Sequence, residues 1–244
     1  MNFSVLPTNK SIVGKIIRIP LKFIPPIQIP ILQGKLKGKK WIVGSSVHGC
    51  WLGGYEYKKR ILFEKIVKKG SCVFDIGANV GFYTLLSSEL VGPKGTVISF
   101  EPLPRNIYFL KKHLRINKLT NVKIIEAAVS DSSGIKYFEP SPSPSMAHLS
   151  KRGDLKVKTV SLDKLILKDK VPSPQYMKID VEGAEMNVLL GAESILKNIH
   201  PIIFLATHGG YIHKKCIKFL QSLDYHFEPI IGDNIKETDE IFAY

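Results

Sequence analysis

The stretch VFDIGANVGFYTLL (residues 73–86) has the pattern of a buried strand, a glycine-containing turn and the start of a helix. A second apolar run, in GTVISFEPLPRN (residues 95–106), ends at Glu101, twenty residues after the last glycine of that turn. Glycines at 77 and 81 let a backbone approach a ligand closely, and a carboxylate at the end of the second strand can accept both hydrogen bonds of a ribose diol. Together the two stretches predict a nucleoside-binding half-site.

The turn does not match a phosphate-binding sequence. It has the form G-x-x-x-G instead of G-x-G-x-x-G, no Gly-Lys-Ser/Thr follows it, and Asp75 precedes it. A carboxylate there repels a pyrophosphate but attracts an ammonium and a sulfonium group, which favours S-adenosylmethionine as ligand. The alternative is a plain strand, turn and helix capped by Asn79. The residues expected around the cofactor are Asp75, Gly77, Ala78, Asn79, Gly81, Phe82, Tyr83, Glu101, Pro102, Glu126 and Ala127.

The chain also resembles a known family, the FkbM family of S-adenosylmethionine-dependent O-methyltransferases. Five runs carry the resemblance, in this order: DIGANVGFYTLL, ISFEPLPRNIYFLKKHLRIN, IIEAAVSD, VSLDKL and MKIDVEGAEMNVLLGAE. They lie between about Gly34 and Tyr225, and MKIDVEGAE is the most distinctive. The resemblance implies a class I methyltransferase fold, methylation of a hydroxyl oxygen and, in many members, a sugar as acceptor.

Strands and helices alternate along most of the chain, which predicts an α/β protein with a parallel sheet. With the resemblance, the expected fold is a Rossmann-like, seven-stranded, mostly parallel sheet with helices on both faces and an antiparallel C-terminal hairpin. We divide the chain into a basic N-terminal extension, residues 1–54, and a methyltransferase domain, residues 55–244. The extension is expected to hold a short hairpin or extended segment at Trp41 to Trp51. Expected strands are 72–76, 97–100, 122–125, 157–160, 175–179, 202–206, 226–231 and 237–243, and expected helices are 55–69, 82–90 and 106–116.

Ligands of such sheets bind beyond the carboxyl ends of the strands, so residues that end strands are candidates for chemistry. Asp180, Glu182 and Glu185 follow the fourth strand, and a carboxylate there can take the proton of an acceptor hydroxyl as the methyl group is transferred. Lys178 shares a strand face with Asp180 and can orient the acceptor or keep a carboxylate ionised. Glu182 and Glu185 also fit a structural role at a helix N-terminus.

His208 follows the next strand, in the sequence THGG. It is a candidate general base or, with Asp180, a ligand for a divalent cation, and a structural hydrogen-bond donor is the alternative. We expect no metal, because the seven histidines show no dense ligand spacing. Glu126 is equally consistent with contact to the adenine and with an ordinary surface carboxylate.

Charge is concentrated near the N-terminus. Residues 1–70 contain 14 lysines and arginines but only two acidic residues, and so hold 12 of the 14 net positive charges of the chain. Residues 1–40 mix these basic residues with apolar ones, which fits contact with an anionic membrane surface or a partner, or equally a basic arm packed on the domain. The chain has no recognisable nucleic-acid-binding module, so nucleic acid is not an expected partner.

Two further features bear on location and acceptor. Three cysteines without paired spacing and an apolar stretch broken by charges and prolines (residues 12–32) predict a cytoplasmic enzyme, peripheral at most to the inner face of a membrane. The segment 139–154 is predicted to be a loop, either a lid that brings His148, Lys151 and Arg152 to the acceptor or a solvent loop. The expected acceptor is a hydroxyl of a saccharide or glycan, including a lipid-linked one. The alternatives are a small phenolic or polyketide acceptor, or a membrane-associated nucleoside-binding module without catalysis.

Overall fold

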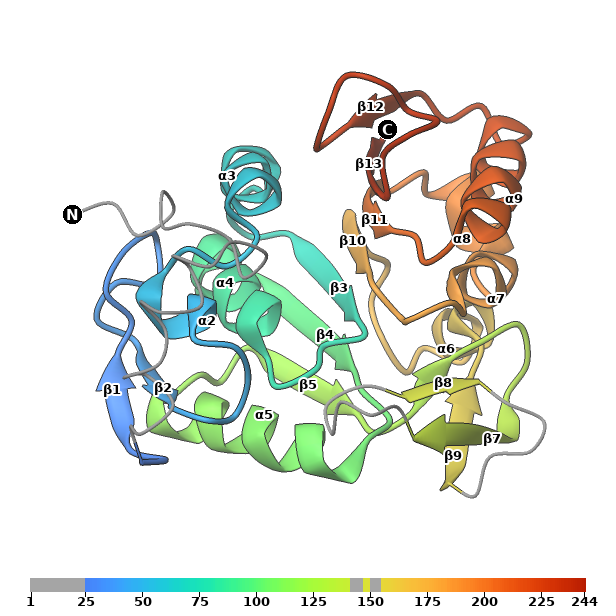
Figure 1. Cartoon of the computed structure of the whole chain (residues 1–244). Helices are drawn as coiled ribbons and strands as arrows, with labels where there is room; N and C mark the ends of the chain where they lie inside the picture. Colours follow the sequence, from blue (N-terminus) through green and yellow to red (C-terminus); the bar gives the residue numbers. More distant parts are fainter. Residues whose placement is uncertain (1–24, 141–146, 150–154) are drawn as a thin grey trace.

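The computed structural model describes residues 25–140, 147–149 and 155–244, and its centre is a seven-stranded sheet (Figure 1). The strand order is β12-β13-β11-β10-β3-β4-β5, and β13 runs in the direction opposite to the other six strands. This confirms the predicted fold class and the antiparallel C-terminal hairpin. The strands are β3 (Cys72–Ile76), β4 (Thr96–Phe100), β5 (Val122–Ile125), β10 (Tyr176–Ile179), β11 (Ile202–Ala206), β12 (Phe227–Pro229) and β13 (Glu240–Ala243).

Helices cover both faces of the sheet, as Figure 1 shows. One face carries α3 (Tyr57–Ile66), α4 (Phe82–Val91) and α5 (Pro104–Ile116), and the other carries α7 (Glu185–Leu190), α8 (Glu193–Asn198) and α9 (Gly210–Gln221). A shorter helix, α6 (Leu162–Leu167), begins at Ser161, whose hydroxyl accepts from the Lys164 N–H. This N-terminal cap is the usual role of serine in a helix start.

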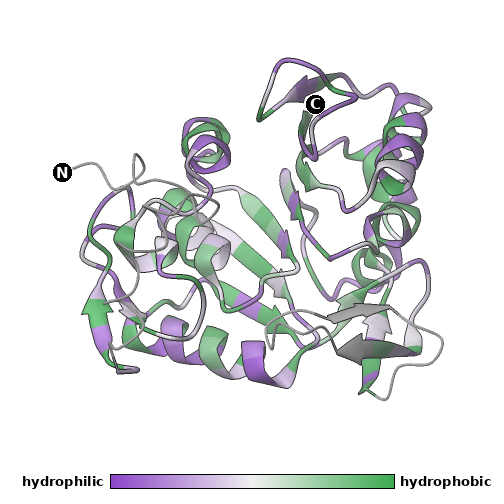
Figure 2. Cartoon of the chain, in the orientation of Figure 1, coloured by the Kyte–Doolittle hydropathy of each residue, from purple (hydrophilic) through white to green (hydrophobic). Residues whose placement is uncertain are grey.

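Two apolar cores follow from the alternation of side chains along the strands. On β3, Phe74 and Ile76 belong to the core beneath α7–α9, and Val73 belongs to the core beneath α3 and α4. Both faces of a parallel sheet are buried, so its strands read as continuous apolar runs. Figure 2 shows this in the mostly green central strands, whereas α5 and α9 alternate between green and purple. Because β3 and β10 are otherwise apolar, Asp75 and Lys178 stand out as charges placed inside the second core.

A second, four-stranded sheet follows β5. Its order is β6-β9-β7-β8, with β6 (Ala128–Val129), β7 (Gly134–Pro140), β8 (Ala147–Leu149) and β9 (Leu155–Val160). The predicted strand at 157–160 is part of β9. The predicted loop 139–154 is partly wrong, because β7 runs through Pro140 and residues 147–149 form an edge strand on β7. The prolines and serines of this segment exclude a central strand, but an edge strand tolerates them. Lys151 and Arg152 lie outside the described residues.

The segment before α3 also differs from expectation. The hairpin pairs β1 (Gln28–Pro30) with β2 (Lys40–Ile42), and α2 (Gly49–Leu52) occupies the second half of the stretch predicted as a hairpin or extended segment. Trp41, Trp51 and Phe63 belong to the same core as α4. Trp41 stacks on the His113 ring of α5, with ring centroids 3.9 Å apart. The alternation of polar and apolar residues in this stretch could not reveal a contact with a residue so distant in the sequence. The division of the chain at residue 54 stays a prediction, and residues 1–24 lie outside the described residues.

Candidate active site

A cavity of about 270 Å³ lies at the carboxyl ends of β3, β4 and β10. The turn after β3 contributes Gly77, Ala78 and Asn79 to its wall, β4 is followed by Glu101, and β10 by Asp180. The strands that meet here are neighbours in the sheet, so residues far apart in sequence come to one edge. The predicted residues that line this cavity are Gly77, Ala78, Asn79, Phe82, Tyr83, Glu101, Pro102, Lys178, Asp180 and Glu182.

Glu101 is held rigidly at the cavity wall. Its Oε2 accepts from the Asn79 N–H at 2.8 Å, and its Oε1 accepts from the Leu103 N–H at 2.9 Å and from Asn106 Nδ2 at 3.2 Å. Burial raises the pKa of this carboxyl to about 7, against the opposing effect of these donors. Asn106, which sequence reasoning missed, lies in the first turn of α5, two residues after the proline that starts that helix. The arrangement fixes one carboxylate where a ribose is expected.

The two glycines of the turn are required by chain packing. Gly77 has φ +77°, and a Cβ there would lie 1.9 Å from the carbonyl oxygen of Asp180. Gly81 has φ +98°, and a Cβ there would lie 2.4 Å from Leu110 Cδ1 of α5. Only glycine meets both demands without strain. Gly77 therefore allows the turn after β3 to approach the end of β10, and Gly81 allows α4 to approach α5. Gly81 does not line the cavity, contrary to its expected place beside the cofactor.

Asp75 lies behind the cavity wall and is paired with Lys178. The two residues are register partners on adjacent strands, so their side chains point to the same face of the sheet. Asp75 is fully buried; its Oδ2 accepts from the Thr84 hydroxyl at 2.6 Å, and its Oδ1 lies 3.6 Å from Lys178 Nζ. Burial raises the pKa of Asp75 although Lys178 opposes the shift. Asp75 is not part of the cavity lining.

Lys178 connects both sides of the cavity. Its Nζ donates to the carbonyl oxygen of Gly77 at 2.9 Å and lies 3.5 Å from Asp180 Oδ2. Burial disfavours the ammonium, but Asp180 and Asp75 outweigh it and raise the pKa of Lys178. The lysine therefore stays charged and holds the turn after β3 to the end of β10.

A second buried lysine lies nearby. Lys59 of α3 pairs with Glu56 at 2.6 Å and with Glu240 of β13 at 2.7 Å. The Nζ atoms of Lys59 and Lys178 lie 5.5 Å and 5.6 Å from the centre of the Tyr83 ring. Nothing in the sequence pattern marks Lys59, because a lysine in an amphipathic helix is normally exposed.

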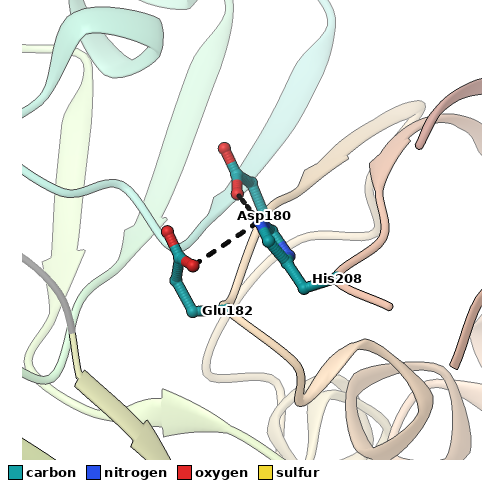
Figure 3. A group of neighbouring side chains, drawn as sticks. All are labelled: Asp180, Glu182 and His208. Atoms are coloured by element: carbon teal, nitrogen blue, oxygen red, sulfur yellow. Dashed lines mark ion pairs between the residues drawn. The ribbon is translucent and has the colours of Figure 1, made fainter. Parts of the chain in front are cut away.

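Asp180, Glu182 and His208 form a compact group at the cavity. His208 Nε2 lies 3.8 Å from Asp180 Oδ1 and 3.5 Å from Glu182 Oε2. Figure 3 shows both carboxylates directed toward the imidazole ring, one from the end of β10 and the other from the loop that follows. The structure thus brings together three residues that the sequence analysis named as candidates for the acceptor side. The side chain of His208 is 36% exposed, whereas Asp180 is 21% exposed.

Glu185 contacts this group through the other ring nitrogen of His208. It is fully buried at the first turn of α7, and its Oε1 accepts from His208 Nδ1 at 2.7 Å and from the Gly183 N–H at 2.9 Å. This hydrogen bond is the largest cause that raises the pKa of His208, to about 9. His208 is therefore an imidazolium at neutral pH and must give up a proton before it can act as a base.

The two carboxylates beside His208 titrate differently. Burial opposes ionisation of Asp180, but Lys178, Lys59 and His208 together outweigh it and lower the pKa of that carboxyl. For Glu182 burial dominates, so its pKa is raised although His208 opposes the shift. A raised pKa makes Glu182 the stronger proton acceptor of the pair, and Asp180 the more permanent charge.

Two other predicted residues lie away from the cavity wall. Glu126 is about half exposed and pairs with Lys111 of α5 at 2.5 Å. Ala127 is buried in the core, and its neighbour Ala128 lines the cavity instead. Tyr55, Phe138 and Asn106 are lining residues that sequence reasoning missed. Tyr55 and Phe138 come from the segment before α3 and from the second sheet, whose packing on the domain no local pattern reveals.

The fold and the cavity define a class I methyltransferase. Residues 75–227 match the model of the methyltransferase FkbM domain, and the chain belongs to this family. The hexuronic acid methyltransferase AglP of Haloferax volcanii is 32% identical over 181 residues, which are 72% of this chain and 73% of that protein. The 31-O-demethyl-FK506 methyltransferase FkbM of Streptomyces tacrolimicus is 25% identical over 161 residues, covering 52% of this chain and 61% of that protein.

Solved structures agree on the fold. The methyltransferase FkbM from Methylobacillus flagellatus KT superimposes with a TM-score of 0.54 at 17% identity, over 71% of this chain and 43% of that one. A precorrin-6y C5,15-methyltransferase from Geobacter metallireducens GS-15 gives a TM-score of 0.51 at 16% identity, over 77% of this chain and 86% of that one. These structures confirm the fold, whereas the match to the family model and the similarity to AglP confirm the expected family and enzyme class.

The cofactor of this class is S-adenosylmethionine, and the cavity fits it. Glu101 supplies a buried carboxylate at the wall, and Asp180 and Glu182 supply negative charge for a cationic ligand. When bound, the cofactor supplies an electrophilic methyl group on a sulfonium. The remaining chemistry belongs to the residues on the acceptor side.

Proposed function

We propose that this methyltransferase transfers a methyl group to a hydroxyl oxygen of a saccharide. The observation that carries the proposal is the similarity to AglP, whose name gives hexuronic acid as its acceptor, over almost three quarters of both chains. The polar character of the acceptor side supports it, because Asp180, Glu182 and His208 all present groups that hydrogen-bond to hydroxyls.

The chemistry asks for a group that removes the hydroxyl proton as the carbon–oxygen bond forms and the carbon–sulfur bond breaks. A carboxylate within hydrogen-bond reach can take that proton, and the raised pKa of Glu182 suits it to this role. Asp180, kept ionised by Lys178, would orient the hydroxyl. His208 would join as a hydrogen-bond donor in its charged form. We propose the cofactor roles of Gly77, Asn79 and Glu101 on the geometry described above.

The test is incubation with methyl-labelled S-adenosylmethionine and matched acceptors: a glycan containing hexuronic acid, the same glycan with its carboxyls reduced, and a simple phenol. We expect label in the glycan, in a form that resists mild alkali, because a methyl ether survives alkali and a methyl ester does not. Label that alkali releases, or label only in the phenol, would overturn the proposal.

A second acceptor class is favoured by one observation. The relative from Streptomyces tacrolimicus is named for a 31-O-demethyl-FK506 acceptor, and the cavity has apolar lining residues such as Tyr55, Phe82 and Phe138. We rank this class second, because the aligned region is shorter and the identity is lower.

We further propose that residues 1–40 hold the enzyme at an anionic membrane surface, where a lipid-linked glycan would be within reach. Among the residues that the structure describes, no helix is long and apolar enough to cross a membrane. The support for surface contact is the sequence: eight basic residues and no acidic one between positions 1 and 40.

A further inference from the structure

We propose that Asp180, Glu182 and His208 bind a divalent cation, which binds and activates the acceptor hydroxyl. The inference deepens the proposed function, and so rests on it for the role of the cation, though not for its binding. One ligand atom from each residue lies within 4.8 Å of the others. These are two carboxylate oxygens and one imidazole nitrogen, a donor set that suits Mn²⁺, Mg²⁺ or Zn²⁺.

Two of the three separations between the ligand atoms are close to those of an occupied site, and all three are within 4.8 Å. Two ligands that each lie about 2.1 Å from one ion are separated by roughly 3.0 to 3.4 Å when they subtend 90° to 110°. The separations from His208 Nε2 to the two carboxylates, 3.5 and 3.8 Å, exceed this by a few tenths of an ångström. Small side-chain rotations of Asp180 and Glu182 would close the site.

The hydrogen bond to Glu185 orients the histidine as a ligand. A metal-binding histidine usually donates its other ring N–H to a carboxylate, which fixes both the tautomer and the ring plane. His208 Nδ1 donates to Glu185 at 2.7 Å, which leaves Nε2 directed toward Asp180 and Glu182. A bound cation would take the place of the Nε2 proton, so His208 would be a neutral ligand with the ion and a charged hydrogen-bond donor without it. Glu185 is 0% exposed, and its Oε2 has no hydrogen-bond partner within the part of the chain that is described. Surface ion pairs do not require a buried carboxylate, whereas orientation of a metal-binding imidazole does use one.

The position relative to the cavity suits a catalytic ion. Asp180 and Glu182 both line the cavity that holds the cofactor residues Gly77 and Glu101. Three protein ligands leave coordination positions for the acceptor, as catalytic metal sites do. A cation there would lower the pKa of the bound hydroxyl, so that its proton passes to a carboxylate or to water while the oxygen attacks the methyl carbon. The two carboxylate ligands would balance the charge of the ion beside a cationic cofactor.

Binding can be tested with Mn²⁺ on the full-length protein after treatment with chelator. We expect one Mn²⁺ per chain by titration of the free-ion electron paramagnetic resonance signal. We also expect a ¹⁴N coupling in the electron spin-echo modulation of the bound ion, from the imidazole. His208→Ala should lower the affinity at least tenfold and abolish the coupling. Glu185→Gln should lower the affinity about 10- to 100-fold although Glu185 does not touch the ion.

The matched control is His226→Ala, an exposed histidine far from Asp180 in the sequence, which should bind Mn²⁺ like the wild type. His208→Ala leaves the buried Glu185 without its partner, so the fold of each variant is checked by circular dichroism. Glu182→Gln, at a side chain that is 33% exposed, provides an independent ligand variant. Wild-type protein that binds no more Mn²⁺ than His208→Ala, or bound Mn²⁺ without nitrogen coupling, would overturn the proposal. Either result would mean that His208 and the neighbouring lysine side chains, without a metal ion, balance the charge of these carboxylates. None of these measurements uses an acceptor, so failure here is distinct from failure of the proposed saccharide activity.

Discussion

Replacing Lys178 with methionine should destabilise the protein strongly, because it leaves Asp75 buried without its cation. Asp75 is 0% exposed and its Oδ1 lies 3.6 Å from Lys178 Nζ. Removing one partner of a buried ion pair costs about 3 to 5 kcal/mol. Protonation sets an upper limit: neutralising an aspartate of ordinary pKa 3.8 at pH 7 costs about 4 kcal/mol, at 1.36 kcal/mol for each pH unit. We therefore expect a loss of about 3 to 4 kcal/mol at pH 7.

The pH dependence of this loss separates it from simple loss of packing. In Lys178→Met the folded-state pKa of Asp75 should lie well above the unfolded value, so the proton-linked stability is present at low pH and is lost as pH rises. The same arithmetic limits the cost at pH 5 to about 1.6 kcal/mol. Urea unfolding at pH 5 and pH 7, with a thermal scan at pH 7, measures both. The melting temperature at pH 7 should fall by roughly 6 to 16 °C, at about 2 to 4 °C for each kcal/mol.

The double variant Asp75→Asn/Lys178→Met should recover most of the loss, since asparagine keeps the contact with Thr84 without a charge. Lys214→Met, at an exposed position on α9, is the matched control and should change stability little. A loss that is equal at the two pH values, or one that Asp75→Asn does not relieve, would refute the pairing of these two residues as the source of the effect.

Three further predictions concern the cofactor, the acceptor and the basic arm. Glu101→Ala should weaken S-adenosylmethionine binding by about 1.5 to 3 kcal/mol in calorimetry. Wild-type affinity should also fall as pH is lowered through about 7, where Glu101 protonates, and unchanged affinity would remove Glu101 from the site. Asp180→Asn should keep cofactor affinity within a few-fold but reduce turnover by roughly a hundredfold or more, and an active variant would end its catalytic assignment. Replacing Lys10, Lys15, Arg18 and Lys22 with glutamine should reduce co-sedimentation with anionic liposomes in a salt-dependent way, and equal pelleting would contradict the membrane proposal. These substitutions are preferable to deleting residues 1–40, because Ile31 and Leu36 are buried in the core.

Much of the central sheet was predictable, because its strands are short apolar runs separated by glycines and helical repeats. The observed β3, β5 and β11 have the predicted bounds. The rest of the second sheet, apart from the strand at 157–160, and the actual pairing of the β1–β2 hairpin were missed for a common reason. Both depend on pairing between segments whose own patterns are weak, such as Gln28–Pro30 with Lys40–Ile42. Which of these short segments pair depends on the tertiary packing of the whole domain, and the local sequence of each segment does not reveal it.

The site was predictable to the level of which strand ends meet, and less so for the direction of each side chain. The two acidic residues nearest the cofactor turn illustrate the difference. Asp75 and Glu101 both lie close to strand ends, but Asp75 lies within β3, on the face that α4 covers, whereas Glu101 lies just beyond β4 at the cavity wall. Asp75 is level with Ser99 in the sheet, so Glu101 lies two residues further toward the carboxyl edge, and this step along the strand separates a buried counter-ion from a lining residue.

This placement gives Asp75 a role that the sequence did not suggest. As a buried counter-ion it holds Lys178 charged, and Lys178 in turn donates to the Gly77 carbonyl and lies beside Asp180. One ammonium thus fixes both the backbone of the cofactor turn and a carboxylate on the acceptor side. Substitutions at Asp75 should therefore disturb cofactor affinity and turnover together, whereas Glu101 variants should act mainly on affinity and Glu182 variants mainly on turnover. Lys178, which lies within the sheet, therefore links the position of the cofactor turn to the position of Asp180.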